Sequence, residues 1–193
     1  MHSPASHPGR ETVSATALRI HLVIGPVGAG KSTFARQLVR QHRAVPLNLD
    51  DWMATLFSPD RPGQPDADVM AWYVPRTLRC LAQIWKTAEA VLDAGADVVL
   101  EVGLIQQHQR DAFYARMGPW ADATVVYVLD APRAVRRERV LRRNAEQGET
   151  FSMVVPPHIF ELASDLWQPP TEAECAHRRV VFVPVAGPQP AVH

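Results

Sequence analysis

The chain has 193 residues, with 20 Lys and Arg against 20 Asp and Glu, and this length suits one domain with a full hydrophobic core. The formal net charge of +0 argues against a nucleic-acid partner, because such partners usually require a surplus of basic residues. Two cysteines are too few for a disulfide framework. No stretch reaches the roughly 20 apolar residues of a membrane helix, and residues 1–16 lack the apolar run of a signal peptide. The composition therefore predicts a cytoplasmic protein that does not enter a membrane.

The first part of the chain predicts a strand, a glycine-rich loop and a helix. Residues 1–17 are expected to form a disordered extension, and residues 18–184 the folded domain. The apolar run 18–24 ends at a glycine and predicts a buried strand, whereas the apolar spacing of 32–41 predicts a helix. The loop between them reads Gly-Pro-Val-Gly-Ala-Gly-Lys-Ser.

The middle of the chain predicts two further strands, at 45–49 and 97–102. Asp50 and Asp51 follow the first of these strands, and the segment 58–66, rich in Pro, Gly and Asp, predicts a loop. Pro75 is expected in the first turn of a helix that runs to Leu92 and ends at Gly95. Residues 106–117 predict another helix.

The last part of the chain predicts a strand at 123–129, an arginine-rich helix to about residue 144, and a mobile lid at 148–157. A helix at 158–167, a strand at 179–183 and a disordered tail at 185–193 are expected to follow. Strands that alternate with helices imply a parallel sheet with helices on both faces. The sequence therefore predicts a three-layer α/β/α fold of the P-loop NTPase type with an arginine-rich lid.

The spacing Gly-x-x-x-x-Gly-Lys-Ser between a strand and a helix is the P-loop pattern of nucleotide-binding proteins. Its glycines let backbone N–H groups turn toward one point, where the start of the helix adds a partial positive charge. Lys31 is expected to reach the β- and γ-phosphates of ATP, and the Ser32 hydroxyl to coordinate Mg²⁺. The predicted nucleotide-binding residues are Gly25, Pro26, Val27, Gly28, Ala29, Gly30, Lys31, Ser32 and Thr33.

Three acidic residues lie where predicted strands end, which is the edge of a parallel sheet that collects ligands. Asp50 is the candidate general base for an acceptor hydroxyl, although Asp50 or Asp51 could instead cap the helix that follows. Glu101 is the candidate residue for the metal shell or for the acceptor, because it ends an apolar strand as a Walker-B acid does. Asp130 precedes Ala131-Pro132 and is interpreted as a helix cap rather than as part of the site.

Six arginines crowd the helix before the predicted lid: Arg133, Arg136, Arg137, Arg139, Arg142 and Arg143. A charged run of this kind is often only a solvated helix face. Alternatively, the face that carries Arg136, Arg139 and Arg143 could close over the nucleotide, where guanidinium groups would neutralise the transferred phosphoryl group. We assign Arg137 and Arg139 to catalysis and Arg143 to ATP binding.

Four segments carry a family resemblance: the loop 25–33, Leu-Asn-Leu-Asp-Asp at 47–51, Val-Val-Leu-Glu at 98–101, and Leu-Asp-Ala-Pro at 129–132 with the arginines after it. With these segments the chain resembles small P-loop kinases of the polynucleotide kinase, zeta toxin and chloramphenicol phosphotransferase group over residues 20–170. The resemblance implies that Asp50 is the catalytic base and that the arginines at 137–143 form a lid over ATP. Met53 and Glu101-Val102-Gly103 depart from the pattern of the polynucleotide kinases, which argues against a nucleic-acid 5′-hydroxyl substrate.

These observations predict an ATP- and Mg²⁺-dependent phosphotransferase that acts on a hydroxyl of a small molecule. Trp52, Met53, Phe57, Trp72 and Tyr73 could line the acceptor pocket or could be core residues. A kinase for a nucleotide-sugar or a nucleic-acid end is the alternative enzyme, and a non-catalytic ATP-binding switch is the alternative of another class. A switch would keep Lys31 and Ser32 but tolerate the loss of Asp50.

Overall fold

The computed structural model describes residues 19–60, 69–148 and 151–184, and its centre is a parallel sheet with the strand order β2-β3-β1-β4-β5. The strands are β1 (Ile20–Ile24), β2 (Val45–Asn48), β3 (Val98–Glu101), β4 (Thr124–Leu129) and β5 (Arg179–Val183). All five were predicted to within about two residues. The predicted extension 1–17, the tail 185–193 and parts of the predicted loop 58–66 and lid 148–157 lie outside the described residues.

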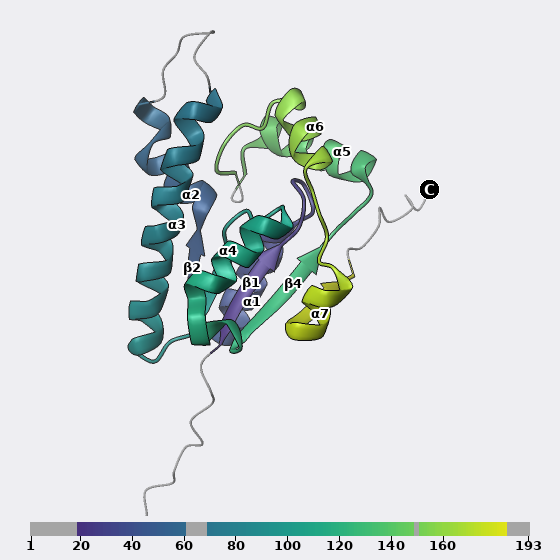
Figure 1. Ribbon diagram of the computed structural model, residues 1–193. Helices are drawn as coiled ribbons and strands as arrows, with labels where there is room; N and C mark the ends of the chain where they lie inside the picture. Colours follow the sequence, from purple (N-terminus) through teal and green to yellow (C-terminus); the bar gives the residue numbers. More distant parts are fainter. Residues whose placement is uncertain (1–18, 61–68, 149–150, 185–193) are drawn as a thin grey trace, which may run out of the picture.

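Helices lie on both sides of this sheet (Figure 1). They are α1 (Lys31–His42), α2 (Leu49–Leu56), α3 (Val69–Asp93), α4 (Gln107–Met117), α5 (Arg133–Glu146), α6 (Pro157–Asp165) and α7 (Glu172–His177), with short 3₁₀ turns at Ser58–Asp60 and Gly118–Ala121. Among the described residues, no helix has the length and apolar character needed to cross a membrane. The predicted three-layer α/β/α fold is confirmed.

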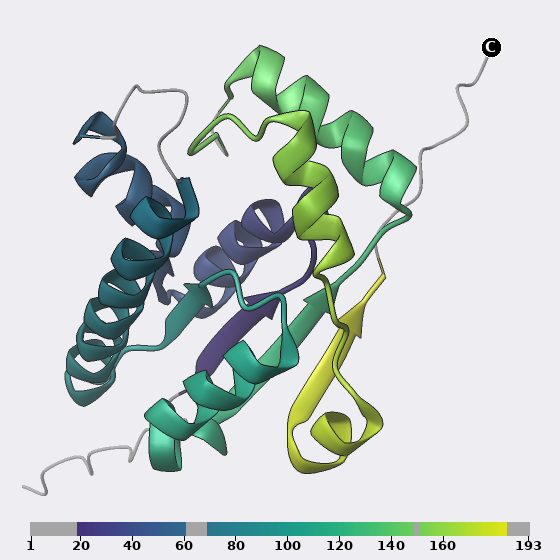
Figure 2. The ribbon, with the colours of Figure 1, turned by 45° about the horizontal axis from the view of Figure 1, so that its top comes forward.

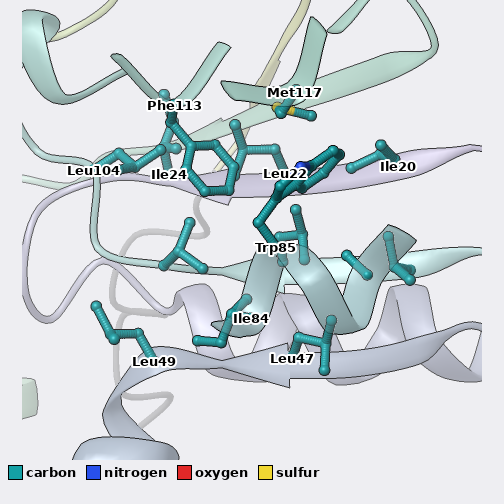
Figure 3. Close-up of a cluster of buried hydrophobic side chains, with 14 of the residues drawn as sticks. Ile20, Leu22, Ile24, Leu47, Leu49, Ile84, Trp85, Leu104, Phe113 and Met117 are labelled. Carbon is teal, nitrogen blue, oxygen red and sulfur yellow. The ribbon is translucent and has the colours of Figure 1, made fainter. Parts of the chain in front are cut away.

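Alternation along the strands explains the three layers, because successive side chains of a strand point to opposite faces. Ile20, Leu22 and Ile24 of β1 belong to a buried cluster with side chains of α3 and α4, among them Trp85 and Phe113 (Figure 3). The intervening Val23 packs on the other face, in a second cluster with Val99 and Leu129 of neighbouring strands and with Ala35 and Leu38 of α1. The central strands β1, β3 and β4 are therefore buried on both faces of the sheet.

The start of α3 was predicted wrongly. The helix begins at Val69, so Pro75 lies inside it rather than in its first turn. An interior proline costs a helix about 3 kcal/mol, because it lacks an N–H and its ring crowds the preceding turn. Pro75 is exposed, whereas Trp72 and Tyr73 of the same helix pack against the core. This packing of the residues before Pro75 outweighs the local preference of proline for a first turn.

The helix α7 was not predicted, since six residues are too few to show helical spacing. Its N-cap is Thr171, whose hydroxyl accepts a 3.2 Å hydrogen bond from the Glu174 backbone N–H. Arg110 of α4 is fully buried, and its guanidinium group donates to both carboxylate oxygens of Glu174 at 2.8 to 3.1 Å. Tyr114 donates to the same carboxylate at 3.0 Å. A buried ion pair thus holds α7 against α4.

Candidate functional site

The loop between β1 and α1 has a backbone that only glycine can adopt at two positions. Gly25 has φ +148°, and a Cβ there would lie 2.1 Å from the Leu129 carbonyl oxygen. Gly28 has φ +80°, and a Cβ there would lie 2.6 Å from the Arg136 carbonyl oxygen. Pro26, Val27, Ala29 and Gly30 complete the loop, which the Ala29 N–H closes with a 3.3 Å bond to the Pro26 carbonyl. The loop has the strand-to-helix setting and the glycine geometry of a P-loop.

Lys31 and Ser32 open α1 directly behind this loop, and Thr33 follows on its exposed side. The Lys31 ammonium group donates a 3.0 Å hydrogen bond to the Pro26 carbonyl, so the side chain folds back over the loop. Desolvation lowers the pKa of Lys31, while the charges of Glu101 and Asp50 act in the opposite direction. The two carboxylates therefore favour the charged ammonium form at the loop.

Glu101, the last residue of β3, connects the loop to the neighbouring strand. One of its carboxylate oxygens accepts a 2.8 Å bond from the Ser32 hydroxyl, and the other accepts a 3.0 Å bond from the Asn48 amide. The residue is only 8% exposed, so desolvation raises its pKa, and the charge of Lys31 and the Ser32 hydrogen bond lower it. A hydroxyl next to a desolvated carboxylate offers the oxygen ligands that Mg²⁺ prefers. The donor set of Ser32 and Glu101 therefore fits the predicted metal.

Asp50 lies in the first turn of α2, and the predicted capping role is wrong for both Asp50 and Asp51. The cap is Asn48, whose side-chain oxygen accepts from the backbone N–H groups of Asp50 at 2.8 Å and Asp51 at 3.2 Å. Sequence reasoning missed Asn48, although an Asn followed, after one residue, by two acidic residues is a typical helix start. The Asp50 carboxylate is therefore not used to cap the helix.

The surroundings of Asp50 combine solvent access with strong charge effects. The side chain is exposed at the surface, yet enough protein surrounds it that desolvation raises its pKa, with the charges of Lys31 and Arg143 lowering it and that of Asp51 raising it. Burial and the charge of Asp50 also raise the pKa of Tyr73 to about 12. Asp50 therefore lies within electrostatic reach of the loop lysine, an arginine of α5 and a tyrosine of α3.

Aromatic residues of α2 and α3 pack against the core, and one of them, Tyr73, is close enough to Asp50 to interact with its charge. Met53 is 1% exposed and belongs to the core, whereas Trp52, Phe57, Trp72 and Tyr73 are half-buried and pack against that core. The guanidinium carbon of Arg76 lies 4.4 Å from the Trp72 ring centroid, and that of Arg79 lies 5.7 Å from the Phe57 centroid. Sequence reasoning did not include these two arginines, because they come after the aromatic segment in the sequence. They meet the rings only once the chain is folded.

Arg136 of α5 contacts the P-loop directly. The residue is 5% exposed, and its guanidinium group donates to the carbonyls of Ala131 at 2.9 Å and Val27 at 3.1 Å, and to the Ser164 hydroxyl at 3.0 Å. Because Arg136 binds a carbonyl of the loop, it joins the start of α5 to the loop and to α6. The helix α5 thus lies close to the carboxyl ends of the strands together with α6 (Figure 2).

The predicted capping role of Asp130 is also wrong. The N-cap of α5 is Pro132, which has no side-chain donor or acceptor. Asp130 instead accepts a 2.7 Å bond from the Ala131 N–H and a 3.0 Å bond from the indole N–H of Trp167. The residue therefore holds the segment after α6 against the end of β4.

The arginines assigned to catalysis and ATP binding differ in their surroundings. Arg137 is exposed and donates a 2.8 Å bond to Glu161 of α6, which also accepts from Arg133. Arg139 is half-buried on the same helix. The charge of Arg143 acts on both Lys31 and Asp50. Of the three assigned arginines, Arg143 is therefore the one whose charge is felt at the loop.

One nitrogen atom of Arg143 is a buried hydrogen-bond donor that a bound anion could satisfy. Among the described residues, its Nε is one of the few buried side-chain nitrogen atoms without a hydrogen-bond partner. A buried donor left unpaired costs about 1–3 kcal/mol or more when the group is charged. A phosphate oxygen would satisfy this donor with a charge-assisted bond. The residues of the site therefore fit a nucleoside triphosphate as well as Mg²⁺.

A cavity of about 240 Å³ opens on the α1 side of Glu101. Ser32, Arg36, Asn48, Asp51, Glu101 and Ser152 are among its lining residues. The Ser152 hydroxyl donates a short hydrogen bond to Asp51, so the segment after α5 contacts α2 across 101 residues of sequence. Sequence reasoning missed Ser152, because nothing local to it indicates this contact.

Comparison with known proteins agrees with the geometry. The sequence model of a family described as AAA domain matches residues 20–157, and no curated protein sequence matches the chain. A sugar kinase from Janibacter sp. HTCC2649 is 16% identical with a TM-score of 0.58, covering 86% of this chain and 84% of that one. Kti12 from Chaetomium thermophilum, solved with ADP-AlF3, is 16% identical with a TM-score of 0.60, covering 85% and 88%. A gluconokinase from Sinorhizobium meliloti 1021 is 17% identical with a TM-score of 0.56, covering 89% and 85%. These likenesses show the fold of P-loop kinases.

Proposed function

Because this chain belongs to the AAA domain family and has the fold of P-loop kinases, we propose that it is an ATP- and Mg²⁺-dependent phosphotransferase that acts on a hydroxyl of a small molecule. The observation that carries the proposal is the position of Asp50. Its carboxylate interacts with the charges of Lys31 and Arg143 and is not used as a helix cap. A nucleotide-binding module without catalysis would need Lys31 and Ser32 but not an acidic group at this place.

Each residue of the site has a role that follows from its position. Ser32 and Glu101 would hold Mg²⁺, which when bound neutralises phosphate charge. Lys31 and Arg143 would bind the phosphate oxygens and stabilise the charge that develops on them. Asp50 would accept the proton of the acceptor hydroxyl, which requires its ionised form. Arg137 and Arg139 remain proposals for catalysis, and the ion pair of Arg137 with Glu161 would have to open for that residue to act.

The acceptor would bind between α2 and α3, next to Asp50. Trp52, Trp72 and Tyr73 offer half-buried aromatic surface there, which suits a small molecule with an apolar part. Asp50, Asp51 and Asp60 are exposed on the same part of the chain, and such carboxylates favour a neutral or amine-bearing alcohol over a polyanion. We propose that class of acceptor, and we expect no phosphorylation of an oligonucleotide 5′-hydroxyl.

Arg76 and Arg79 favour a second candidate. Their guanidinium groups lie against Trp72 and Phe57 and could bind one anionic group of an acceptor, such as a phosphate or carboxylate. An acceptor of this kind would be a small acidic alcohol, for example a nucleotide-sugar. The two candidates differ in the charge of the acceptor but share the same transfer chemistry.

A panel of acceptors separates these possibilities. Purified protein with ATP and Mg²⁺ would be incubated with neutral alcohols, amino alcohols, acidic alcohols and 5′-hydroxyl oligonucleotides, and each mixture examined by mass spectrometry for the gain of one phosphate. The proposal predicts a gain in the neutral or amino-alcohol group. A gain only among acidic alcohols, reduced by Arg76→Ala, would support the second candidate. Binding of ATP without any ADP formation or transfer would contradict the phosphotransferase proposal.

A further inference from the structure

Three potential metal ligands meet at the edge of the sheet opposite the P-loop. His21 is the second residue of β1, Asp97 directly precedes β3, and His42 is the last residue of α1. The strands are parallel, so the starts of β1 and β3 lie at the far edge from Ser32 and Glu101. Within the described part of the chain, one ligand atom from each of the three residues lies within 4.8 Å of the other two.

The distance between His21 and Asp97 is close to that between two ligands of one ion, because the Nε2 atom of His21 lies 3.7 Å from Oδ2 of Asp97. The His21 and His42 rings lie against each other, with centroids 4.2 Å apart and planes inclined by 31°. Ligand atoms of a tetrahedral zinc ion lie about 3.3 Å apart when each bond measures about 2.0–2.1 Å. The 3.7 Å distance between His21 Nε2 and Asp97 Oδ2 would therefore need to shorten only slightly for both atoms to bind one ion. The half-buried His42 ring, at the end of its helix, would turn to direct a nitrogen atom at the ion.

The buried His21 side chain supplies an independent observation. It is 1% exposed, and its Nε2 is a buried atom without a hydrogen-bond partner among the described residues. Its other nitrogen, Nδ1, lies 3.2 Å from the Tyr127 hydroxyl. When Nδ1–H donates to that hydroxyl oxygen, Nε2 carries the free lone pair and lies 3.7 Å from Oδ2 of Asp97. A histidine that ligates a metal typically donates its second ring N–H to such a partner, which fixes the tautomer and the ring orientation.

The Asp97 carboxylate is held in place by the backbone. Its Oδ1 accepts a 3.0 Å hydrogen bond from the Arg19 N–H, which leaves Oδ2 directed at His21. Two imidazoles and one carboxylate are the ligand set of three-residue zinc sites, in which a water molecule completes the tetrahedron. Mg²⁺ prefers sites made of oxygen ligands, so the ion that suits this cluster differs from the one that suits Ser32 and Glu101.

From this geometry we propose that His21, His42 and Asp97 form a binding site for Zn²⁺ or a similar divalent transition metal, with Tyr127 as the positioning residue of His21. The site joins the end of α1 to the starts of β1 and β3. An ion bound there would stabilise the folded chain, because the unfolded chain does not hold the three ligands together. This inference does not depend on the proposed phosphotransferase activity.

The test measures metal binding and stability on the full chain. To remove interference from the two histidines near the N-terminus, all proteins carry His2→Ala and His7→Ala. After dialysis against limiting Zn²⁺, elemental analysis should give one zinc per chain, Co²⁺ should give the visible absorption of a tetrahedral site, and Zn²⁺ should raise Tm. Excess Mg²⁺ should not displace the zinc.

Matched variants assign the ligands. His42→Ala and Asp97→Asn should each abolish stoichiometric zinc and the Tm increase, whereas His108→Ala, which changes an exposed histidine of α4, should change neither. Tyr127→Phe removes only a hydroxyl and should weaken zinc binding about 10- to 100-fold, as is typical for the partner of a ligating histidine. The absence of stoichiometric zinc from the folded parent protein, or equal zinc binding by the His42→Ala and His108→Ala variants, would overturn the proposal.

Discussion

The Ser32 hydroxyl donates a 2.8 Å hydrogen bond to the Glu101 carboxylate, which lies 69 residues further along the chain. This contact joins the first turn of α1 to the end of β3. It also brings together the two residues that sequence reasoning had assigned to the metal. The contact arises because β1 and β3 are parallel neighbours, so the loop after one strand faces the side chain that ends the other.

Lys31→Ala should abolish phosphate transfer while leaving the fold intact. The ammonium group provides phosphate-binding charge, and alanine is well tolerated at a helix start. The chain offers a matched control, since Lys86 is the only other lysine and is exposed on α3. Circular dichroism and ATP turnover of both variants test the prediction. Unchanged ATP affinity and turnover in Lys31→Ala would contradict the P-loop role of the loop.

Arg143→Ala should weaken ATP binding about 10- to 100-fold, because a charged hydrogen bond contributes about 1.5–3 kcal/mol. The Nε of this residue is buried without a partner, so we expect this donor to serve the nucleotide. Arg142 is its exposed neighbour, and Arg142→Ala should bind ATP like the parent protein. Calorimetric titration of ATP measures both. Equal affinities of the two variants would show that Arg143 serves the fold alone.

Glu174→Gln should destabilise the protein by about 3–5 kcal/mol, since it leaves the charge of the fully buried Arg110 without its partner. Tyr114 would lose a charged acceptor at the same time. Glu172 is exposed in the first turn of the same helix, so Glu172→Gln is the control and should change stability little. Urea unfolding followed by circular dichroism measures both free energies. A loss of less than about 1 kcal/mol in Glu174→Gln would mean that the pair behaves as a surface ion pair.

The free energy of unfolding should fall as the pH decreases below about 6.5 when a chelator is present. Burial, followed by the charge of His42, lowers the pKa of His21 from its usual 6.5. The folded chain then binds this proton less readily than the unfolded chain, so stability is fully present above pH 6.5 and is lost as the pH falls toward the lowered pKa. His21→Gln removes the ionisable group and should flatten the dependence between pH 5 and 7. An identical slope in both proteins would assign the dependence to other groups.

Local patterns were sufficient to predict the strands, the P-loop and the two carboxylates at strand ends. Glycine spacing and apolar runs are properties of adjacent residues, and parallel pairing brings the carboxyl ends of strands to one edge. Contacts between distant segments could not be predicted in this way. Arg136 binds the Val27 carbonyl across 109 residues, and Asp51 binds Ser152 across 101. The meeting of His21, His42 and Asp97 likewise depends on which strands are neighbours.

The rate of phosphate transfer by Asp50→Asn tests the proposed function most directly. Asparagine keeps the size of the side chain but cannot accept the proton, so kcat should fall about 10²–10⁴-fold while the affinity for ATP stays within a few-fold of the parent protein. Asp93→Asn, which changes an exposed carboxylate at the end of α3 away from the site, should keep full activity. A kcat of Asp50→Asn that matches the parent protein and Asp93→Asn would contradict the role of Asp50 as the general base of a phosphotransferase.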